Sequence, residues 1–457
     1  MSKEPFDLFP LGKDKRCHVS TNCAETQVNN NILVVGGSGS GKTMSVLDPM
    51  LLHLQHGNAV SVFTKHSQRT DDLKQILEGR GYKVYTLDFT KPETCRFGYD
   101  PLHYCSTDNQ ITELATSIVC SKSDKNVEVQ KDPYWDNSAA NLLAVLLRFV
   151  SNGHYAGGRT LADALELVDC LSRTNWQLPE AQESEQDYLY FQDGDEPDEE
   201  PEDEKSDDFM LDQLSHLAEV DPNGAALWKT LLNGEAAGMK ASIQGSLLTP
   251  LKLMFTPSVC TLMKKKPFDF GWLLKPKTVL FVYTSPVEKA LHMFISIFYS
   301  QLFRYLFQAA DARPDQVLPH PVYVLCDDFA TGCTVPEFPQ LISIFREKGI
   351  STTLLVQSES QLTGLYNEVN ATTIINNCDT YIYLGGNDLS SVDNVSKRLN
   401  IPYTEVLYMP IGREYFFRRG QRPITTERYD FCHDPLYENR NQKQSRTGRE
   451  KSKAQRA

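Results

Sequence analysis

Short apolar runs alternate along the chain with segments in which apolar residues recur every three or four positions. The short runs are typical of strands buried on both faces, and the longer segments are typical of amphipathic helices. Their alternation predicts an α/β fold with a mostly parallel sheet. The predicted strands are Ile32–Val35, Ala59–Thr64, Lys83–Leu87, Thr278–Thr284, Val322–Cys326, Ser351–Val356 and Thr380–Leu384.

These strands fall into two groups, before residue 90 and after residue 277, with a helical pattern between them. The helices expected there are Ile111–Val119, Trp135–Val150, Leu161–Leu171, Met210–Leu217, Ala225–Leu232 and Met239–Phe255. We therefore expect one α/β nucleotide-binding core that is interrupted by an all-α insertion domain. The expected boundaries are an N-terminal extension at 1–27, the core at 28–105 and 275–432, the insertion at 106–274 and a tail at 433–457.

The charge is uneven along the chain. The formal net charge is −13, but residues 180–208 alone hold fifteen acidic residues and one lysine, so the remainder is close to neutral. This composition predicts a disordered acidic loop inside the insertion, with an electrostatic decoy or a docking site for a basic partner as the alternatives.

The C-terminal tail has the opposite sign. Residues 440–456 contain seven Lys/Arg and one glutamate among Gln, Ser and Gly. The pattern is typical of a disordered end, and an arm that contacts phosphates or an anionic membrane is the alternative.

Cysteine usage and hydropathy indicate a cytoplasmic protein. The 11 cysteines are scattered singly, without the close pairs that bind zinc. No signal peptide opens the sequence, and no apolar run approaches the roughly 18 residues that a membrane span requires.

The strongest chemical signal is the segment Gly36-Gly37-Ser38-Gly39-Ser40-Gly41-Lys42-Thr43, which follows the first predicted strand. It matches G-x-x-x-x-G-K-[ST], a loop whose backbone N–H groups surround phosphate oxygens. Lys42 is expected to reach the β- and γ-phosphates, and the Thr43 hydroxyl is expected to bind Mg²⁺. A simple Gly/Ser-rich turn is the alternative, which the order of strand, Lys and Thr disfavours.

Two carboxylates complete this prediction. Asp327 and Asp328 end a predicted buried strand, where Asp327 would bind Mg²⁺ and Asp328 would polarise an attacking water. Gln357, at the end of the next strand, is a candidate sensor of the γ-phosphate, although a buried amide that caps the strand is an alternative. Arg346, on a helix end, is a candidate arginine finger for a neighbouring subunit or an ordinary surface residue.

The sequence resembles the VirD4/TraG-type coupling proteins of conjugative type IV secretion, especially those of Gram-positive conjugative elements. The resemblance covers about residues 28 to 430. Its motifs, in chain order, are Asn30-Asn31-Ile32 before the Gly36–Thr43 loop, Asp132-Pro133-Tyr134-Trp135, Phe281-Val282-Tyr283-Thr284-Ser285, Cys326-Asp327-Asp328-Phe329-Ala330, Arg346-Glu347-Lys348-Gly349-Ile350, Gln357-Ser358 with Gln361-Leu362, Asn377-Cys378-Asp379-Thr380 and Gly385-Gly386-Asn387-Asp388.

The resemblance implies a RecA-like P-loop NTPase core, hexameric rings, ATP and Mg²⁺ as cofactors, and ATP-driven translocation of DNA. It implies that a relaxase–DNA substrate is recruited to a type IV secretion channel, with the all-α domain as the substrate-selecting face. It gives Lys42 and Thr43 the phosphate and metal roles, Asp327 and Asp328 the metal and water roles, Gln357 the sensor role and Arg346 the trans-acting finger.

Three departures from the family pattern leave a second function open. Members usually begin with transmembrane helices, which this sequence does not show, so either another chain anchors it at the inner face of the cell membrane or it works in solution. The usual Asp-Pro-Lys-Gly-Glu after the second strand is Thr64-Lys65-His66-Ser67-Gln68 here, and Asp328 replaces the usual Glu. The alternative is a nucleotide-gated adaptor with little or no hydrolysis. A third hypothesis, a cytosolic metabolic kinase, is disfavoured because the sequence shows no acceptor-site motif.

Overall fold

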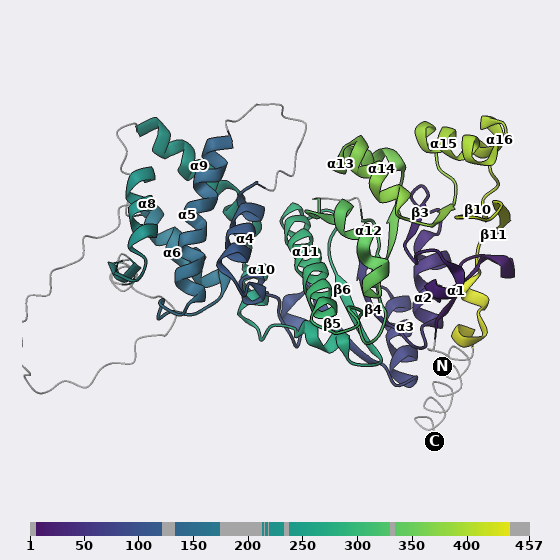
Figure 1. The fold of residues 1–457 in the computed structure, drawn as a ribbon, viewed down its shortest axis with the longest axis horizontal. Helices are drawn as coiled ribbons and strands as arrows, with labels where there is room; N and C mark the ends of the chain where they lie inside the picture. The colour runs from purple at the N-terminus through teal and green to yellow at the C-terminus, as the bar shows by residue number, and fades with distance from the viewer. Residues whose placement is uncertain are drawn as a thin grey trace, which may run out of the picture. The chain divides into compact units, whose positions relative to one another are not determined.

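The computed structural model describes residues 6–120, 133–173, 213, 215–217, 219–232, 237–329 and 334–438. The chain forms two compact units, Met1–Phe97 together with Phe268–Ala457, and Gly98–Pro267 (Figure 1). The expected acidic loop at 180–208 and residues 439–457 of the expected tail lie outside the described residues.

A nine-stranded sheet forms the centre of the first unit. In order across the sheet, the strands are β11 (Ile424–Glu427), β10 (Arg413–Arg418), β9 (Thr380–Tyr383), β3 (Ile32–Val35), β8 (Ile350–Val356), β7 (Val322–Cys326), β4 (Asn58–Phe63), β6 (Thr278–Tyr283) and β5 (Lys83–Asp88). The strands from β9 to β5 are all parallel, whereas β10 and β11 extend the sheet in antiparallel pairs. The predicted α/β fold is confirmed, and each predicted strand is present with ends that differ by at most one residue.

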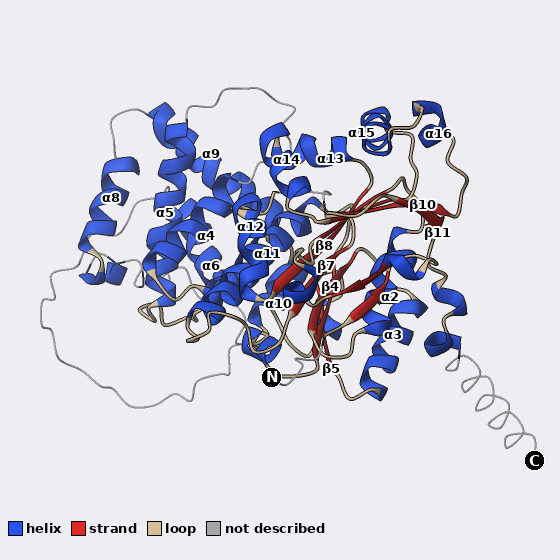
Figure 2. Ribbon diagram, turned by 45° about the vertical axis from the view of Figure 1, so that its right-hand side comes forward, coloured by secondary structure: helices blue, strands red, loops and turns tan. Residues whose placement is uncertain are grey.

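Helices cover both faces of this sheet, which explains why its strands are continuously apolar. Figure 2 shows α2 and α3 on one side of the strands and α11 and α12 on the other. The helical segments of the unit are η1 (Lys15–Cys17), α1 (Cys23–Thr26), the π-helical η2 (Thr43–Leu47), α2 (Asp48–His53), α3 (Gln68–Gly79), η3 (Pro92–Thr94), η5 (Phe270–Leu274), α11 (Lys289–Asp311), α12 (Phe338–Lys348), α13 (Glu359–Tyr366), α14 (Glu368–Asn376), α15 (Leu389–Leu399), α16 (Tyr403–Leu407) and η6 (Phe431–His433).

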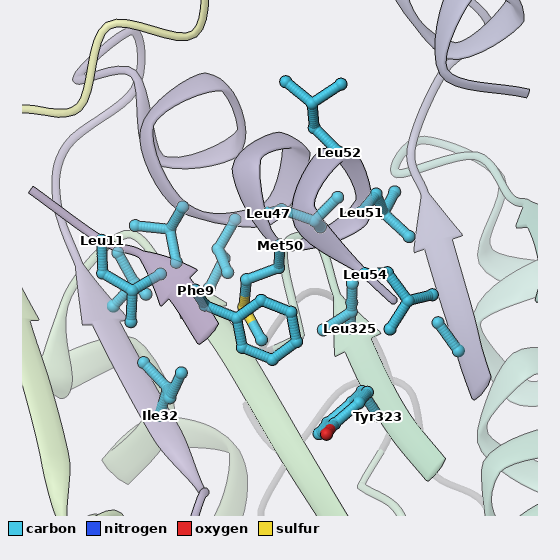
Figure 3. Close-up of a cluster of buried hydrophobic side chains, with 14 of the residues drawn as sticks. Phe9, Leu11, Ile32, Leu47, Met50, Leu51, Leu52, Leu54, Tyr323 and Leu325 are labelled. Atoms are coloured by element: carbon cyan, nitrogen blue, oxygen red, sulfur yellow. The ribbon is translucent and has the colours of Figure 1, made fainter. Parts of the chain in front are cut away.

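Residues 6–27, the described part of the expected N-terminal extension, belong to the unit that contains the sheet and do not form a separate part. The strands β1 (Leu8–Pro10) and β2 (His18–Ser20) form an antiparallel pair. Phe9 on β1 is buried in the same cluster as Met50 of α2 (Figure 3). Its ring packs edge-to-face against that of Tyr323, with the ring centroids 5.1 Å apart. The strand is too short to show a hydrophobic period, so the sequence pattern gave no sign of it.

Hydrogen bonds of Asp7 connect this N-terminal pair of strands to the nine-stranded sheet. Its buried carboxylate accepts hydrogen bonds from the N–H groups of Gln55, His56 and Gly57 at 2.6–2.9 Å, and from the Tyr323 hydroxyl at 2.9 Å. Gln55, His56 and Gly57 lead into β4, while Tyr323 lies on β7. The N-terminal residues therefore connect two central strands.

We predict that Phe9→Ala lowers the free energy of unfolding by about 3–5 kcal/mol, because it removes a buried ring from a packed cluster. Leu8→Ala is the matched control, since the Leu8 side chain is 52% exposed on the same strand. Chemical denaturation should show a change within about 0.5 kcal/mol for this control. Equal stabilities of the two variants would contradict the packing described here.

The second unit is built from helices in its described part. They are η4 (Pro101–Tyr104), α4 (Asp108–Cys120), α5 (Pro133–Ser151), α6 (Leu161–Arg173), α8 (Pro222–Leu232), α9 (Ala237–Met254) and α10 (Pro257–Lys264). The central helix α5 contacts α4, α6, α8 and α9. It is apolar around most of its circumference, as expected for a helix surrounded by others.

The two units divide the chain at slightly different residues from those expected. Residues 98–105 belong to the helical unit, and residues 268–274 belong to the unit that contains the sheet. Asp100 accounts for the first shift, because its carboxylate accepts hydrogen bonds from the N–H groups of Leu102 and Leu161 at 3.2 and 3.1 Å. No helix in the described part of the chain has the length and hydropathy needed to cross a bilayer.

Glu414 is an unusual inward-facing residue on β10. Its side chain is fully buried, and neither carboxyl oxygen has a hydrogen-bond partner among the described residues. A Cβ atom on Gly12 would lie 2.3 Å from Glu414 Oε1, so a larger residue there would force the Glu414 carboxyl group to move. Burial raises the pKa of Glu414 from its ordinary 4.5 to about 9, against the charge of Arg428, which lowers it.

This raised pKa predicts a pH-dependent stability. Between pH 4.5 and 9 the folded chain holds a proton on Glu414 that the unfolded chain releases, so stability falls as the pH rises through this range. The slope from one group is at most about 1.4 kcal/mol per pH unit. Glu414→Gln should therefore stabilise the protein more at pH 8 than at pH 5 in thermal unfolding. A stability difference that does not change with pH would contradict the prediction.

Candidate functional site

The segment Gly36–Thr43, which the sequence predicts to bind phosphate, forms a loop between β3 and the helical turn η2. Gly39 and Gly41 have φ of 73° and 87°, a region that favours glycine, so these two positions allow the chain to curl. Two neighbouring strand ends hold the loop: the Gly36 N–H donates to Val356 O at 3.1 Å, and the Gly37 N–H donates to Gly385 O at 2.8 Å. The loop thus lies at the carboxyl edge of the sheet, where α/β proteins bind ligands.

The side chain of Lys42 folds back onto the first residues of this loop. Its Nζ donates to the Gly36 carbonyl at 2.7 Å and to the Gly37 carbonyl at 3.3 Å. Burial lowers the pKa of Lys42, while the charges of Asp328 and Asp327 raise it. A buried ammonium beside backbone carbonyls fits a group that takes up the negative charge of a phosphate.

A hydrogen bond links Thr43 and Asp327, although the strands that precede them, β3 and β7, are not neighbours in the sheet. The strand β8 lies between β3 and β7. The Thr43 hydroxyl nevertheless donates to Asp327 Oδ1 at 3.1 Å. A hydroxyl and a carboxylate held together in this way are two oxygen ligands of the kind that Mg²⁺ prefers, and they fit the predicted metal site.

Burial and the neighbouring Asp328 raise the pKa of Asp327 to about 6, against the hydrogen bond from Thr43 and the charges of Lys42 and Arg69. Such a carboxylate is costly to ionise when no cation lies beside it. A bound divalent cation would remove this cost, which supports Asp327 as a metal ligand.

Asp328 follows in a left-handed backbone conformation with φ of 52°. The chain is held on both sides of it, because the Asp327 N–H donates to Val62 O at 3.1 Å and the Phe329 N–H donates to Leu355 O at 3.0 Å. Aspartate tolerates this conformation better than most residues. The kink directs Asp328 differently from the strand residues before it.

A cavity of about 30 Å³ lies beside these two carboxylates, which is room for about one water molecule. Its polar lining includes Thr284, Ser285 and His292 as well as Asp327 and Asp328. The Thr284 side chain is 8% exposed, and its hydroxyl has no hydrogen-bond partner among the described residues. The cavity therefore offers polar contacts on the side where a reacting water would be needed.

Gln357 lies next to the loop, since it follows Val356, the residue that accepts the Gly36 N–H. Its side chain is exposed, and its N–H donates to Gln361 Oε1 at 3.1 Å. Gln357 is therefore not a buried amide that caps the strand, which was the alternative interpretation. Gln357 emerges between the strands that carry the loop and the carboxylates.

Arg346 does not belong to the same edge. It lies in the last turn of α12, which leads into the amino end of β8, whereas Gln357 follows the carboxyl end of that strand. Its side chain is exposed, and Nη2 donates to Cys23 O at 3.3 Å. Arg346 therefore cannot serve the site of its own chain without a rearrangement.

The segment Thr64–Gln68, where the family pattern is acidic, has a structural use here. His66 hydrogen-bonds to the buried Asp88 and stacks on Tyr283 with ring centroids 3.7 Å apart. Ser67 caps α3 through a hydrogen bond from the Thr70 N–H.

Sequence reasoning missed a buried ion pair beneath the site. Arg69 Nε lies 2.7 Å from Asp48 Oδ2, although its N–H is not directed at the oxygen, so charge and not an aligned hydrogen bond links them. Burial raises the pKa of Asp48 to about 7, Arg69 lowers it and Asp327 raises it further. No motif marks this pair, which joins residues on α2 and α3.

A comparison with protein-family models matches residues 11–401 to the family described as type IV secretory system conjugative DNA transfer. A comparison with curated proteins gave no match.

Solved structures of the plasmid coupling protein TrwB have a similar fold. The bacterial conjugative coupling protein TrwBdeltaN70, in a trigonal form with sulphate, is 16% identical over 89% of this chain and 88% of its own, with a TM-score of 0.58. TrwB in complex with ADP and Mg²⁺ is 16% identical over 88% and 86%, with a TM-score of 0.58. TrwB with a GTP analogue is 15% identical over 95% and 98%, with a TM-score of 0.59. At these identities the likeness establishes the fold.

Proposed function

The chain belongs to the type IV secretory family of conjugative DNA transfer, and we propose that it is an ATP-binding coupling protein that hydrolyses ATP to move DNA. In this role it links a relaxase–DNA substrate to the proteins of a type IV secretion channel. The observation that carries the proposal is the hydrogen bond from Thr43 to Asp327 across β8, with Lys42 beside it. The structures of TrwB with ADP and Mg²⁺ support the choice of ligand.

Each site residue then has a defined task. The N–H groups of Gly36–Thr43 and the Lys42 ammonium hold the phosphates, while Thr43 and Asp327 hold Mg²⁺. The cation neutralises charge on the β- and γ-phosphates when bound. Asp328 accepts a hydrogen bond from the attacking water in the adjacent cavity and so polarises it. Gln357 contacts the γ-phosphate.

We further propose that the active form is a homohexamer at the inner face of the cell membrane. Arg346 would act in the site of the next subunit, which is consistent with its place at the opposite edge of the sheet. DNA contacts would be to phosphates and therefore independent of sequence. Lys264, Lys265 and Lys266 and the C-terminal tail are candidates, although Lys264 already lies 3.3 Å from Glu166.

The first test measures ATP turnover with and without single- and double-stranded DNA. We expect DNA to stimulate the wild type and Lys42→Ala to abolish turnover through loss of phosphate binding. Asp328→Asn should retain ATP binding and lose about 10²-fold or more in turnover, the contribution typical of a positioned base. A wild type that binds ATP but shows no turnover, even with DNA, would reject the motor and leave the nucleotide-gated adaptor.

The second test addresses Arg346. Arg346→Ala should lower turnover by about 10³-fold, as for other arginine fingers. Mixing it with Lys42→Ala should restore part of the activity, because an intact loop then meets an intact Arg346 from its neighbour. Glu347→Ala is the matched control at an adjacent exposed position. A mixture no more active than its separate components would rule out action in trans.

A further inference from the structure

Arg428 contacts the Gly36–Thr43 loop although it lies far from it in the sequence. It follows directly after β11, and its N–H donates to Gly412 O at 2.9 Å, which fixes its backbone. Its side chain is half-buried, and Nη1 donates a short hydrogen bond to the carbonyl oxygen of Ser40. No motif in the sequence marks this residue, which lies 388 positions from Ser40.

This contact determines how one peptide group of the loop is oriented. In a planar trans peptide the C=O and the following N–H point in opposite directions. A donor that holds the Ser40 carbonyl therefore also fixes the direction of the Gly41 N–H, which points away from Arg428. The remaining space is small, since a Cβ on Gly41 would lie 2.6 Å from Arg428 Nη1.

The charge of Arg428 also remains available to an anion. Burial lowers the pKa of Arg428 and the nearby Glu414 raises it, while neither Glu414 oxygen has a hydrogen-bond partner among the described residues. Because burial raises the pKa of Glu414 to about 9, Glu414 is uncharged at neutral pH. The guanidinium therefore contributes positive charge close to the loop without being neutralised there.

We infer that Arg428 is a positioning residue for nucleotide binding: it orients the Ser40–Gly41 peptide so that the Gly41 N–H faces the triphosphate, and it adds positive charge close to the loop. The ligand group that it serves is the phosphate chain and not the base or the sugar. This inference rests on the proposed function, and it names a residue outside the motif that prepares the motif for its ligand.

The test compares Arg428→Ala, Arg428→Lys and Arg422→Ala by calorimetric titration with ATP and with inorganic tripolyphosphate. Arg428→Ala should weaken both ligands about tenfold, a factor that corresponds to about 1.4 kcal/mol. Arg428→Lys keeps the charge but loses the planar guanidinium and should fall between this variant and the wild type. Arg422 is exposed in the turn between β10 and β11, so Arg422→Ala should bind both ligands like the wild type.

Two further measurements separate positioning from a general loss of structure. Guanidinium ion added to Arg428→Ala should restore part of the affinity, and the melting temperature without ligand should stay close to that of Arg422→Ala. In turnover assays the loss should appear in KM more than in kcat, because the loop binds the phosphates in the ground state and the transition state alike.

The outcomes distinguish this inference from the proposed function. If the wild type binds ATP and Arg428→Ala binds both ligands within twofold of it, the inference is wrong and the proposed function stands. A lower melting temperature without rescue by guanidinium would assign Arg428 a structural role only. If the wild type binds neither ligand, while Lys42→Ala behaves identically, the proposed function fails and the inference fails with it.

Discussion

The site depends on the order of the parallel strands, which places β8 between the strand of the loop and the strand of the carboxylates. All parallel strands end at one edge, so Lys42, Thr43 and Asp327 can meet there although 284 residues separate Thr43 from Asp327. The hydrogen bond between Thr43 and Asp327 crosses the end of β8 and leaves the residue that follows it, Gln357, at the same edge. Each further strand between β3 and β7 would move these groups apart by another strand spacing of about 4.8 Å.

The seven parallel strands could be predicted because burial on both faces requires nearly continuous apolar runs, which contrast with the amphipathic helices around them. The antiparallel strands β1, β2, β10 and β11 carry no such signal. The short strand β1 contains a proline, and β10 begins with Arg413 and Glu414 and faces different neighbours along its length. The inward Glu414 contradicts the usual pattern, since its burial becomes visible only once Gly12 and the N-terminal pair are seen to cover it.

Local motifs predicted the chemistry of the site where residues are close in sequence, as in Gly36–Thr43 and Asp327-Asp328. The contacts of Arg428 and Arg69 could not be predicted, because they join side chains that approach only after the sheet has formed. The position of Arg346 relative to its own site is also a consequence of strand direction, since β8 begins near Arg346 and ends at Gln357. The sequence shows which residue types are present, but the distances between these arginines and their partners are set only by the folded sheet.

The same edge concentrates buried charge that has a cost in the absence of a ligand. Burial lowers the pKa of Lys42 and raises those of Asp327 and Asp48, so each charged form is disfavoured by its surroundings. A phosphate chain that meets Lys42 and a divalent cation that meets Asp327 would each supply the opposite charge. A ligand that binds only the folded chain stabilises it. A nucleotide and Mg²⁺ bound as proposed would therefore stabilise the loop and the end of β7, and such differential binding is what a ligand-driven change of shape requires.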